Sequence, residues 1–261
     1  MKIRAKKSLG QNFLIDKQII EKIVECAEIK NKYILEVGPG TGNLTKAIIK
    51  KKPKKIFLVE KDKVLINKLK DELNYDINFI NRDILDINEN ELSENLITVF
   101  GNLPYNISTK ILTKWIKSIH KKLWFDKLIL MFQKEVADRI LSTPNNKNYG
   151  RLSILANWKL RISKITDIHP HSFNPSPKIE STLLLFELKN DIFKLRNPET
   201  LEKITRIFFN QRRKKIKKAY YQLFKDCEIA KSLNLDLNLR PQNLDEKTFY
   251  MLALEYEKLN N

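Results

Sequence analysis

Short apolar runs alternate with longer helical stripes along the first half of the chain. The runs with the length of a buried strand lie at residues 33–37, 55–59, 77–81 and 96–100. Stripes with a helical period lie at residues 16–27 and begin again near Leu44 and Ile107, and Asp16 is the expected N-cap of the first helix. Strands that alternate with helices in this way predict an α/β fold of the nucleotide-binding type.

The pattern changes after Leu188, where strand-like runs give way to helical stripes. Helices are predicted at residues 200–210, 214–224, 228–233 and 245–258. We therefore expect two domains, a binding domain of residues 1–189 and a small helical domain of residues 190–261.

A glycine turn, Gly38-Pro39-Gly40-Thr41-Gly42, follows the first predicted strand of the α/β pattern. Its spacing differs from the dinucleotide fingerprint G-x-G-x-x-G, and no Lys-Ser/Thr pair follows it as in a P-loop. Pro39 also removes one N–H that a pyrophosphate would use. The turn therefore favours a ligand that carries no phosphate.

Acidic residues follow the next two strands of the pattern, Glu60 after the second and Asp83 after the third. An acid about 20 residues past such glycines is placed to accept from ribose hydroxyls. Taken alone, Glu60 also fits a solvated acid and Asp83 a turn cap. In this order, with the glycine turn, they predict a pocket for a phosphate-free nucleoside such as S-adenosylmethionine, whose positive sulfonium suits acidic surroundings.

The fourth run leads into Asn102-Leu103-Pro104-Tyr105, at the strand end where open α/β sheets bind ligands. Pro104 stiffens this turn, the Asn102 amide oxygen can accept, and the Tyr105 ring can stack. These groups match a planar nucleobase amine. An ordinary strand-terminating turn with a half-buried tyrosine is the alternative.

The chain is strongly basic, with 49 Lys and Arg against 31 Asp and Glu, a net charge of 49 − 31 = +18. This charge favours a polyanionic partner such as nucleic acid, although a genomic bias toward Lys, Asn and Ile would also produce it. Cys26 and Cys227 are far apart, so neither a disulfide framework nor a structural zinc is expected. With no signal-like or membrane-length apolar run, a cytoplasmic location is expected, an organelle being left open.

Motifs along almost the whole chain resemble the KsgA-type rRNA adenine dimethyltransferases, in that family's order. They are Lys7 to Leu14 with its Gly10-Gln11-Asn12-Phe13-Leu14, Glu36 to Gly42, Glu60, Asp83, Phe100 to Ser108, Phe132 to Ala137, Tyr149 to Ser153, Ser172 to Ser181 and Phe209 to Lys214. The resemblance implies a class I methyltransferase fold, a seven-stranded, mainly parallel sheet with helices on both faces, and a small helical C-terminal domain.

The resemblance also implies an activity, its cofactor and its partner. Two methyl groups would pass from S-adenosylmethionine to N6 of each of two adjacent adenosines near the 3′ end of small-subunit rRNA, within a pre-ribosomal 30S-type particle. The protein would act in ribosome biogenesis as a monomer, without a metal or a membrane. The implied cofactor residues are Asn12, Leu14, Gly38, Gly40, Glu60, Asp83 and Asn102, and the implied adenine-binding residues are Asn102, Leu103, Pro104 and Tyr105.

Two further features are read together with this resemblance. Phe173, in a Pro-rich loop, is a candidate to close over the adenine opposite Tyr105, with a place in the core as its alternative. The basic run Arg212, Arg213, Lys214, Lys215, Lys217 and Lys218 is a candidate RNA phosphate-contact surface, with a solvated helix face as its alternative.

Other functions on the same fold are a large-subunit rRNA methyltransferase of the antibiotic-resistance type and a non-catalytic ribosome-assembly or transcription factor. The Asn-Leu-Pro-Tyr turn and the acidic pocket argue against a purely non-catalytic role. The basic helical domain favours the small-subunit enzyme over the large-subunit one.

Overall fold

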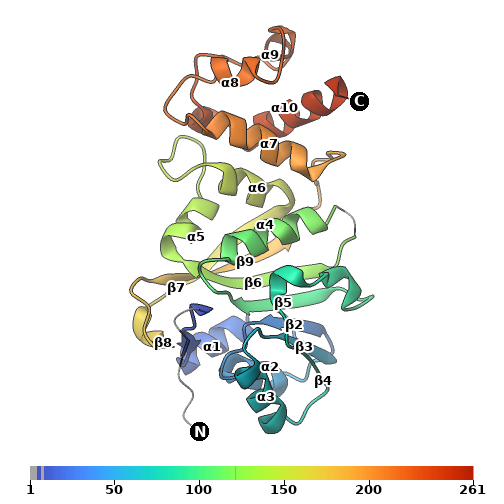
Figure 1. Ribbon diagram of the computed structural model, residues 1–261, viewed down its shortest axis with the longest axis vertical. Coiled ribbons are helices and arrows are strands. Elements are labelled where there is room, and N and C mark those ends of the chain that lie inside the picture. The colour runs from blue at the N-terminus through green and yellow to red at the C-terminus, as the bar shows by residue number, and fades with distance from the viewer. Residues whose placement is uncertain (1–4, 7–8, 121, 261) are drawn as a thin grey trace. The chain divides into compact units, whose positions relative to one another are not determined.

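The structure, a computed structural model, describes residues 5–6, 9–120 and 122–260 of the chain (Figure 1). Its contacts divide the chain into two compact units. Unit 1 comprises residues 1–137 and 162–188, and unit 2 comprises residues 138–161 and 189–261. The expected boundary near residue 190 lies beside the third crossing between the units, at residues 188 and 189. Residues 138–161 belong by their contacts to the same unit as the C-terminal helices. A single boundary in the sequence cannot assign them to that unit. The two domains at 1–189 and 190–261 stay a prediction.

A seven-stranded sheet forms the framework of the binding fold. Its strands lie in the order β4 (Ile77–Ile80), β3 (Lys55–Val59), β2 (Tyr33–Val37), β5 (Ile97–Asn102), β6 (Phe125–Gln133), β9 (Ser181–Leu188) and β7 (Leu160–Ile168). Neighbours from β4 through β6 pair in parallel, and β6 pairs with β9 antiparallel. The predicted α/β class and the mainly parallel sheet are therefore present, and four of the strands lie where the apolar runs predict them.

The short strands β1 (Phe13–Leu14) and β8 (Phe173–Asn174) form a separate antiparallel pair. This pair brings the N-terminal motif beside the Pro-rich loop, although about 160 residues separate them in the sequence.

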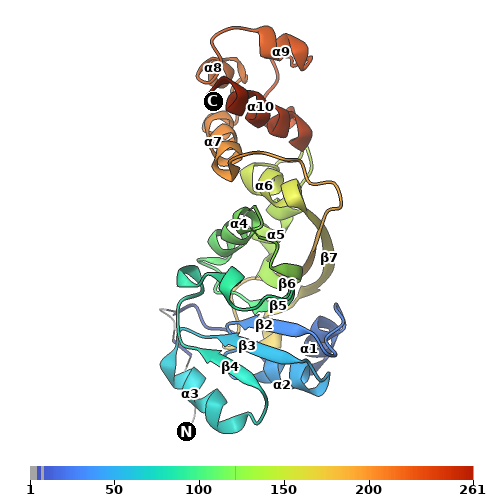
Figure 2. The ribbon, with the colours of Figure 1, turned by 90° about the vertical axis from the view of Figure 1, so that its right-hand side faces the viewer.

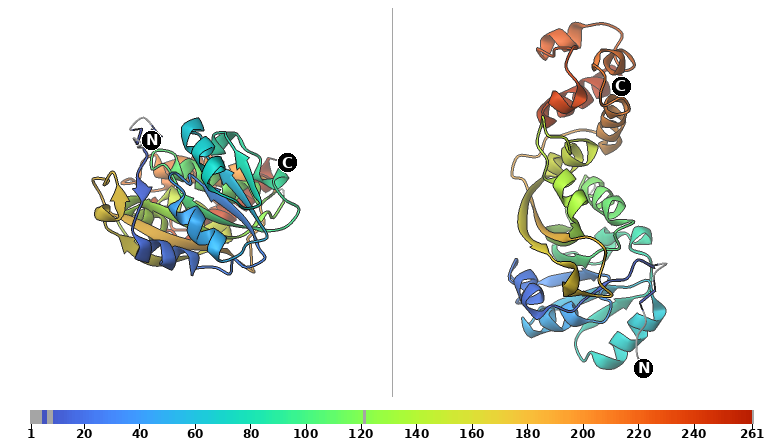
Figure 3. Two further views of the ribbon diagram at one scale, coloured as in Figure 1. Left: turned by 90° about the horizontal axis from the view of Figure 1, so that it is seen from below. Right: turned by 90° about the vertical axis from the view of Figure 1, so that its left-hand side faces the viewer.

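The helices of unit 1 begin where the sequence offers caps or turns. They are α1 (Lys17–Val24), α2 (Asn43–Lys50), α3 (Lys63–Glu72) and α4 (Ser108–Ser118). Asp16 caps α1 as predicted, accepting from the backbone N–H groups of Gln18 and Ile19. Figures 2 and 3 show strands β2 to β4 side by side with α1 and α2 close to them.

Apolar side chains of alternate strand positions meet the helices of unit 1 in one core. Ile34, Ile56 and Leu58 of the sheet share this core with Ile23 of α1 and Ile48 of α2, and all five are at most 1% exposed. Successive side chains of a strand point to opposite faces of the sheet. A strand whose residues are all apolar is therefore buried on both faces. Burial of apolar surface stabilises the fold by roughly 25 cal/mol per Å². The packed core therefore holds in place the strands whose ends carry the polar residues.

The helices of unit 2 are α6 (Arg151–Lys159), α7 (Pro198–Phe209), α8 (Lys217–Tyr221), α9 (Glu228–Ser232) and α10 (Glu246–Leu259), while α5 (Lys134–Ile140) spans the division between the units. Of the four helices predicted after Leu188, three are present as α7, α9 and α10 at nearly the predicted residues, whereas α6 was not predicted. The helix predicted over residues 214–224 is reduced to α8. Residues 210–216 form turns instead, and the Ile216 N–H donates to the Leu239 carbonyl rather than into a helix. No helix of the described residues is long and apolar enough to cross a membrane.

Candidate functional site

A pocket in unit 1 lies at the carboxyl ends of four neighbouring strands. Its lining includes Gly38 after β2, Glu60 after β3, Asp83 after β4 and Asn102 at the end of β5. Residues 9–14 and 103–107 complete much of the wall. Each residue predicted for cofactor binding reaches this one pocket, together with residues 102–105. Gly38, Glu60, Asp83 and Asn102 meet there because parallel strands present their ends at the same edge, whereas Asn12 and Leu14 come from the N-terminal motif. Their roles in binding stay predictions.

The glycine turn needs glycine for space as well as for backbone conformation. Gly38, Gly40 and Gly42 have φ values of +72°, +57° and +82°, in the left-handed region that side chains disfavour. A Cβ on Gly40 would lie 2.7 Å from the Phe13 ring, so the N-terminal motif packs directly on the turn. The turn is anchored to the sheet by the Gly38 N–H, which donates to the Val59 carbonyl at 2.9 Å.

Glu60 is nearly buried, 8% exposed, with both carboxylate oxygens oriented by the backbone. Its Oε1 accepts from the Asp62 N–H at 2.8 Å and its Oε2 from the Gly40 N–H at 3.4 Å. Burial raises the pKa of Glu60, and these two backbone hydrogen bonds oppose the rise. Each oxygen keeps a lone pair with which it can accept from a ligand hydroxyl.

Asp83 lines the pocket and also caps a short helical turn. Its Oδ1 accepts from the Leu85 N–H at 3.0 Å, and its Oδ2 from Lys61 Nζ at 2.9 Å. Burial alone would raise the pKa of Asp83, but these hydrogen bonds and the Lys61 charge hold that pKa below its usual value. The capping role that the sequence offered as an alternative is thus present, and it orients the carboxylate at the pocket wall.

The loop after β5 is held by a hydrogen bond to the N-terminal motif. Asn102 Nδ2 donates to the Asn12 carbonyl at 2.8 Å, which fixes the amide and leaves its Oδ1 as an acceptor. The Pro104 carbonyl accepts from the Ile107 N–H at 3.1 Å and retains a second lone pair. Two acceptors of a stiff turn therefore border the same pocket.

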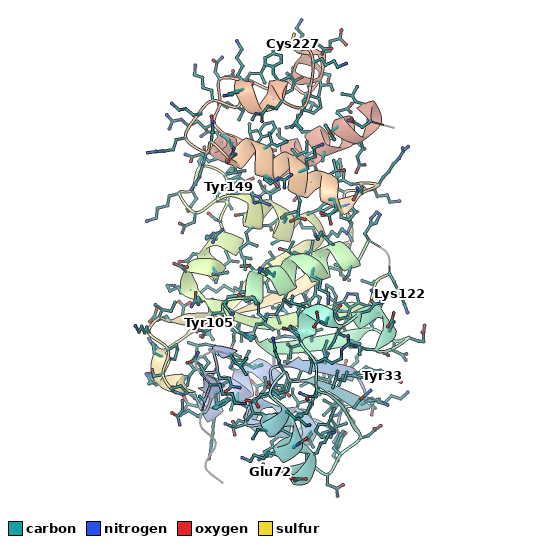
Figure 4. The ribbon with its side chains drawn as sticks, viewed as in Figure 1. Tyr33, Glu72, Tyr105, Lys122, Tyr149 and Cys227 are labelled. Carbon is teal, nitrogen blue, oxygen red and sulfur yellow. The ribbon has the colours of Figure 1, made fainter. Side chains whose placement is uncertain are left out.

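Tyr105, labelled in Figure 4, follows Pro104 and lines the pocket. Its hydroxyl lies 2.6 Å from Ser181 Oγ, the first residue of β9. Burial raises the pKa of this phenol, so the hydroxyl stays neutral at physiological pH.

Phe173 lies in the core of unit 1 and is outside the pocket lining. It is 2% exposed, belongs to the same cluster as Leu14 and Ile20, and its strand β8 pairs with β1. The structure therefore agrees with the alternative interpretation of Phe173, in which its ring is part of the hydrophobic core. Closure over an adenine stays a prediction, and it requires the ring to leave this packing.

Leu14 and Asn12 occupy different places in the N-terminal motif. The Leu14 side chain is buried in the core, while its carbonyl accepts from Asn43 Nδ2 at 2.8 Å. Asn12 donates through Nδ2 to the Gly10 carbonyl and uses its own carbonyl for Asn102. Both residues contribute to the pocket wall. The N-terminal motif therefore forms its part of the wall with backbone atoms as well as with side chains.

Glu36 is a pocket residue that the sequence-based site omitted. It is 1% exposed on β2, and its Oε2 is buried without a hydrogen-bond partner among the described residues. Burial, with a further contribution from the nearby Glu60 charge, raises the pKa of Glu36 to about 8. An acid inside an otherwise apolar strand, just before the glycine turn, was the signal available in the sequence.

The predicted RNA-contact residues lie together on the turn before α8 and on α8 itself, in unit 2. Arg213, Lys214, Lys215, Lys217 and Lys218 are exposed. Arg212 is half-buried and donates to the Asn146 carbonyl at 3.1 Å, so it also holds the turn. We call these six residues, from Arg212 to Lys218, the basic turn. Among the described residues, no cluster of His, Cys, Asp and Glu could hold a metal ion.

Comparisons with known proteins cover nearly the whole chain. A sequence profile described as ribosomal RNA adenine dimethylase matches residues 2–258. The ribosomal RNA small subunit methyltransferase A of Pelagibacter ubique (strain HTCC1062) is 58% identical over 260 residues, 99% of each chain. The protein of the same name from Ehrlichia ruminantium (strain Gardel) is 43% identical over 257 residues, 96% of this chain and 97% of that protein.

Solved structures agree with the fold. A dimethyladenosine transferase from Plasmodium falciparum superimposes with a TM-score of 0.80 at 27% identity, over 95% of this chain and 98% of that one. The 23S rRNA methyltransferase ErmE superimposes with a TM-score of 0.70 at 20% identity, over 96% of this chain and 100% of that one. At that identity the second likeness speaks for the fold alone, which is the Rossmann-like methyltransferase fold expected from the motifs.

Proposed function

Because the chain belongs to the ribosomal RNA adenine dimethylase family, we propose that it methylates N6 of two adjacent adenosines near the 3′ end of small-subunit rRNA. Each adenosine receives two methyl groups, and S-adenosylmethionine is the donor. The substrate is small-subunit rRNA within a pre-ribosomal 30S-type particle in the cytoplasm, and the protein acts as a monomer. Family membership confirms the resemblance drawn from the motifs.

The pocket suits a phosphate-free nucleoside with a positive charge. Gly40 leaves no room for a side chain between the turn and Phe13, Glu60 offers two oriented carboxylate oxygens for ribose hydroxyls, and Asp83 is ionised at the wall. Glu36 Oε2, which is buried and has no hydrogen-bond partner in the described part of the chain, can also pair with a ligand. When bound, S-adenosylmethionine supplies an electrophilic methyl group on a sulfonium leaving group.

The single observation that carries the proposal is the hydrogen bond from Asn102 Nδ2 to the Asn12 carbonyl. The lone pair of an adenine N6 amine is delocalised into the ring, so the enzyme must direct it toward the methyl carbon. Asn102 Oδ1 and the Pro104 carbonyl can accept the two amine hydrogens and favour a pyramidal nitrogen. Orientation of this kind supplies much of the rate without a strong base.

The proposed roles beyond the pocket follow the same physical argument. Tyr105 stacks on the adenine that has been turned out of the RNA, and the basic turn contacts RNA phosphates and so positions the RNA without reading its sequence. Phe173 is retained as a candidate second aromatic contact.

The test is methylation of undermethylated small subunits with S-adenosylmethionine, followed by digestion of the RNA and mass analysis of the adenosines. Dimethyladenosine in small-subunit RNA is the expected product, and fully methylated subunits are the control. Modification confined to large-subunit RNA supports the alternative substrate. Tight binding without methyl transfer supports a non-catalytic assembly role.

A further inference from the structure

One hydrogen bond joins a pocket residue to strand β9, which has no role in the proposed methyl transfer described above. The Tyr105 hydroxyl and Ser181 Oγ are 2.6 Å apart, and either oxygen can be the donor. Tyr105 belongs to the loop after β5, whereas Ser181 begins β9. This contact links residues 76 positions apart in the sequence, and both lie in unit 1.

Ser181 is a fixed point of the sheet. Its side chain is fully buried, and its backbone lies opposite Gln133 in the β6–β9 ladder. The carbonyl of the preceding residue, Glu180, accepts from the Lys134 N–H at 2.9 Å. Because the backbone of β9 is paired with β6 at this point, the Ser181 hydroxyl cannot move far.

The Tyr105 ring has no comparable support from its own loop. The hydrogen bonds of this loop, from Ser108 Oγ to the Tyr105 carbonyl and from the Ile107 N–H to the Pro104 carbonyl, hold the backbone only. Within the part of the chain that the structure describes, Ser181 supplies the hydrogen bond to the phenol. A contact at the far end of the side chain fixes the direction in which the side chain points, so it determines where the ring lies.

We propose that Ser181 is a positioning residue for methyl transfer, because its hydroxyl holds in place the Tyr105 ring against which the target adenine stacks. This inference rests on the proposed function. A freer ring lets the base tilt and turns the N6 lone pair away from the methyl carbon, which lowers the rate of transfer. The second transfer is affected more, because an amine that already carries a methyl group has fewer orientations that fit.

The experiment compares Ser181→Ala, Tyr105→Phe and the double variant with the full-length wild type on undermethylated small subunits. Each single variant is expected to lower kcat about five- to tenfold, as the loss of one hydrogen bond predicts, with an unchanged KM for S-adenosylmethionine. The ratio of monomethyl- to dimethyladenosine should rise. The double variant should be no slower than either single variant, because all three lack the same bond.

Thr182→Val is the matched control, since it removes the neighbouring buried hydroxyl on the same strand and leaves the Tyr105 contact intact. It should keep the wild-type product ratio. Should Ser181→Ala fold poorly, Tyr105→Phe carries the test, because phenylalanine retains the stacking ring.

The inference is overturned if the variants show the wild-type kcat and product ratio, or if Thr182→Val shifts the ratio as much as Ser181→Ala. A wild-type protein that makes no methylated adenosine contradicts the proposed function instead. The two failures are therefore distinguishable.

Discussion

The pocket wall and the basic turn differ in how their polar groups are held. In the pocket, Asn102 and Glu60 are bonded to backbone groups of other segments, and Glu60 is 8% exposed. In the basic turn, Lys214, Lys217 and Lys218 are exposed. A reacting amine must be oriented to within a fraction of an ångström, whereas a phosphate contact needs charge more than exact placement.

This difference has a practical consequence for experiments. Buried groups of the pocket should respond to packing, to loss of a single atom and to pH. Exposed cations should respond to salt, which screens them over about 10 Å at 0.1 M. Variants in the pocket therefore test packing and hydrogen bonding, whereas variants in the basic turn test long-range electrostatic attraction.

The largest effect is expected for Phe173→Ala, which leaves a cavity in the core of unit 1. The free energy of unfolding should fall by about 3–5 kcal/mol, as measured by urea denaturation. Phe173→Leu retains most of the volume and separates packing from recognition. If the folded Leu variant methylates poorly while it binds S-adenosylmethionine normally, the ring has the predicted second role over the adenine; full activity assigns it to the core alone.

Asn102→Ala should have the next largest effect, a drop in kcat of about 10²–10³. The variant loses an acceptor for the amine and the contact to the Asn12 carbonyl. Methylation of small subunits and calorimetric binding of S-adenosylmethionine measure the two consequences. Asn78→Ala, an exposed position on the edge strand β4, is the control and should behave as the wild type. Equal loss in both variants would contradict a specific role for Asn102.

Neutralising four exposed members of the basic turn should weaken binding to small subunits about 10–100-fold at low salt. The changes are Arg213→Gln, Lys214→Gln, Lys217→Gln and Lys218→Gln. The slope of log affinity against log salt should decrease by up to about 3.6, because each lost phosphate contact removes roughly 0.7–0.9. At saturating subunits kcat should be retained.

The matched control for the basic turn changes four exposed lysines of unit 1 to Gln. They are Lys17, Lys22, Lys30 and Lys63. This control removes the same charge and should weaken binding much less. If both sets act equally, net charge rather than the basic turn attracts the RNA.

Glu36→Gln should change how stability depends on pH. The folded protein keeps the Glu36 proton up to about pH 8, whereas the unfolded chain releases it near pH 4.5. Unfolding therefore releases a proton between these values, and the free energy of unfolding falls as pH rises, by up to about 1.4 kcal/mol per unit. The Gln variant should gain stability relative to the wild type from pH 5 to 8 in urea titrations. Glu28→Gln, at an exposed position, should not.

The elements that local pattern controls were predictable from the sequence. Strands β2 and β3 lie at the residues that their apolar runs indicate, and Asp16 caps α1. The strand-end positions of Glu60 and Asn102 were predictable too, because strand order and parallel pairing place such ends on one edge. Where the pattern predicted a longer helix before Phe224, a backbone bond to the Leu239 carbonyl kept the chain in turns.

The sequence by itself determined the α/β class, the family motifs, the excess of positive charge and the set of residues that gather at the sheet edge. Only the tertiary structure decided which atoms those residues use: that Asn102 donates to Asn12, that Ser181 holds Tyr105, that Phe173 lies in the core and that Glu36 keeps its proton. The reason is physical. Periodicity and turn chemistry act over a few neighbouring residues, whereas burial and hydrogen bonding across the sheet depend on segments up to 160 positions apart.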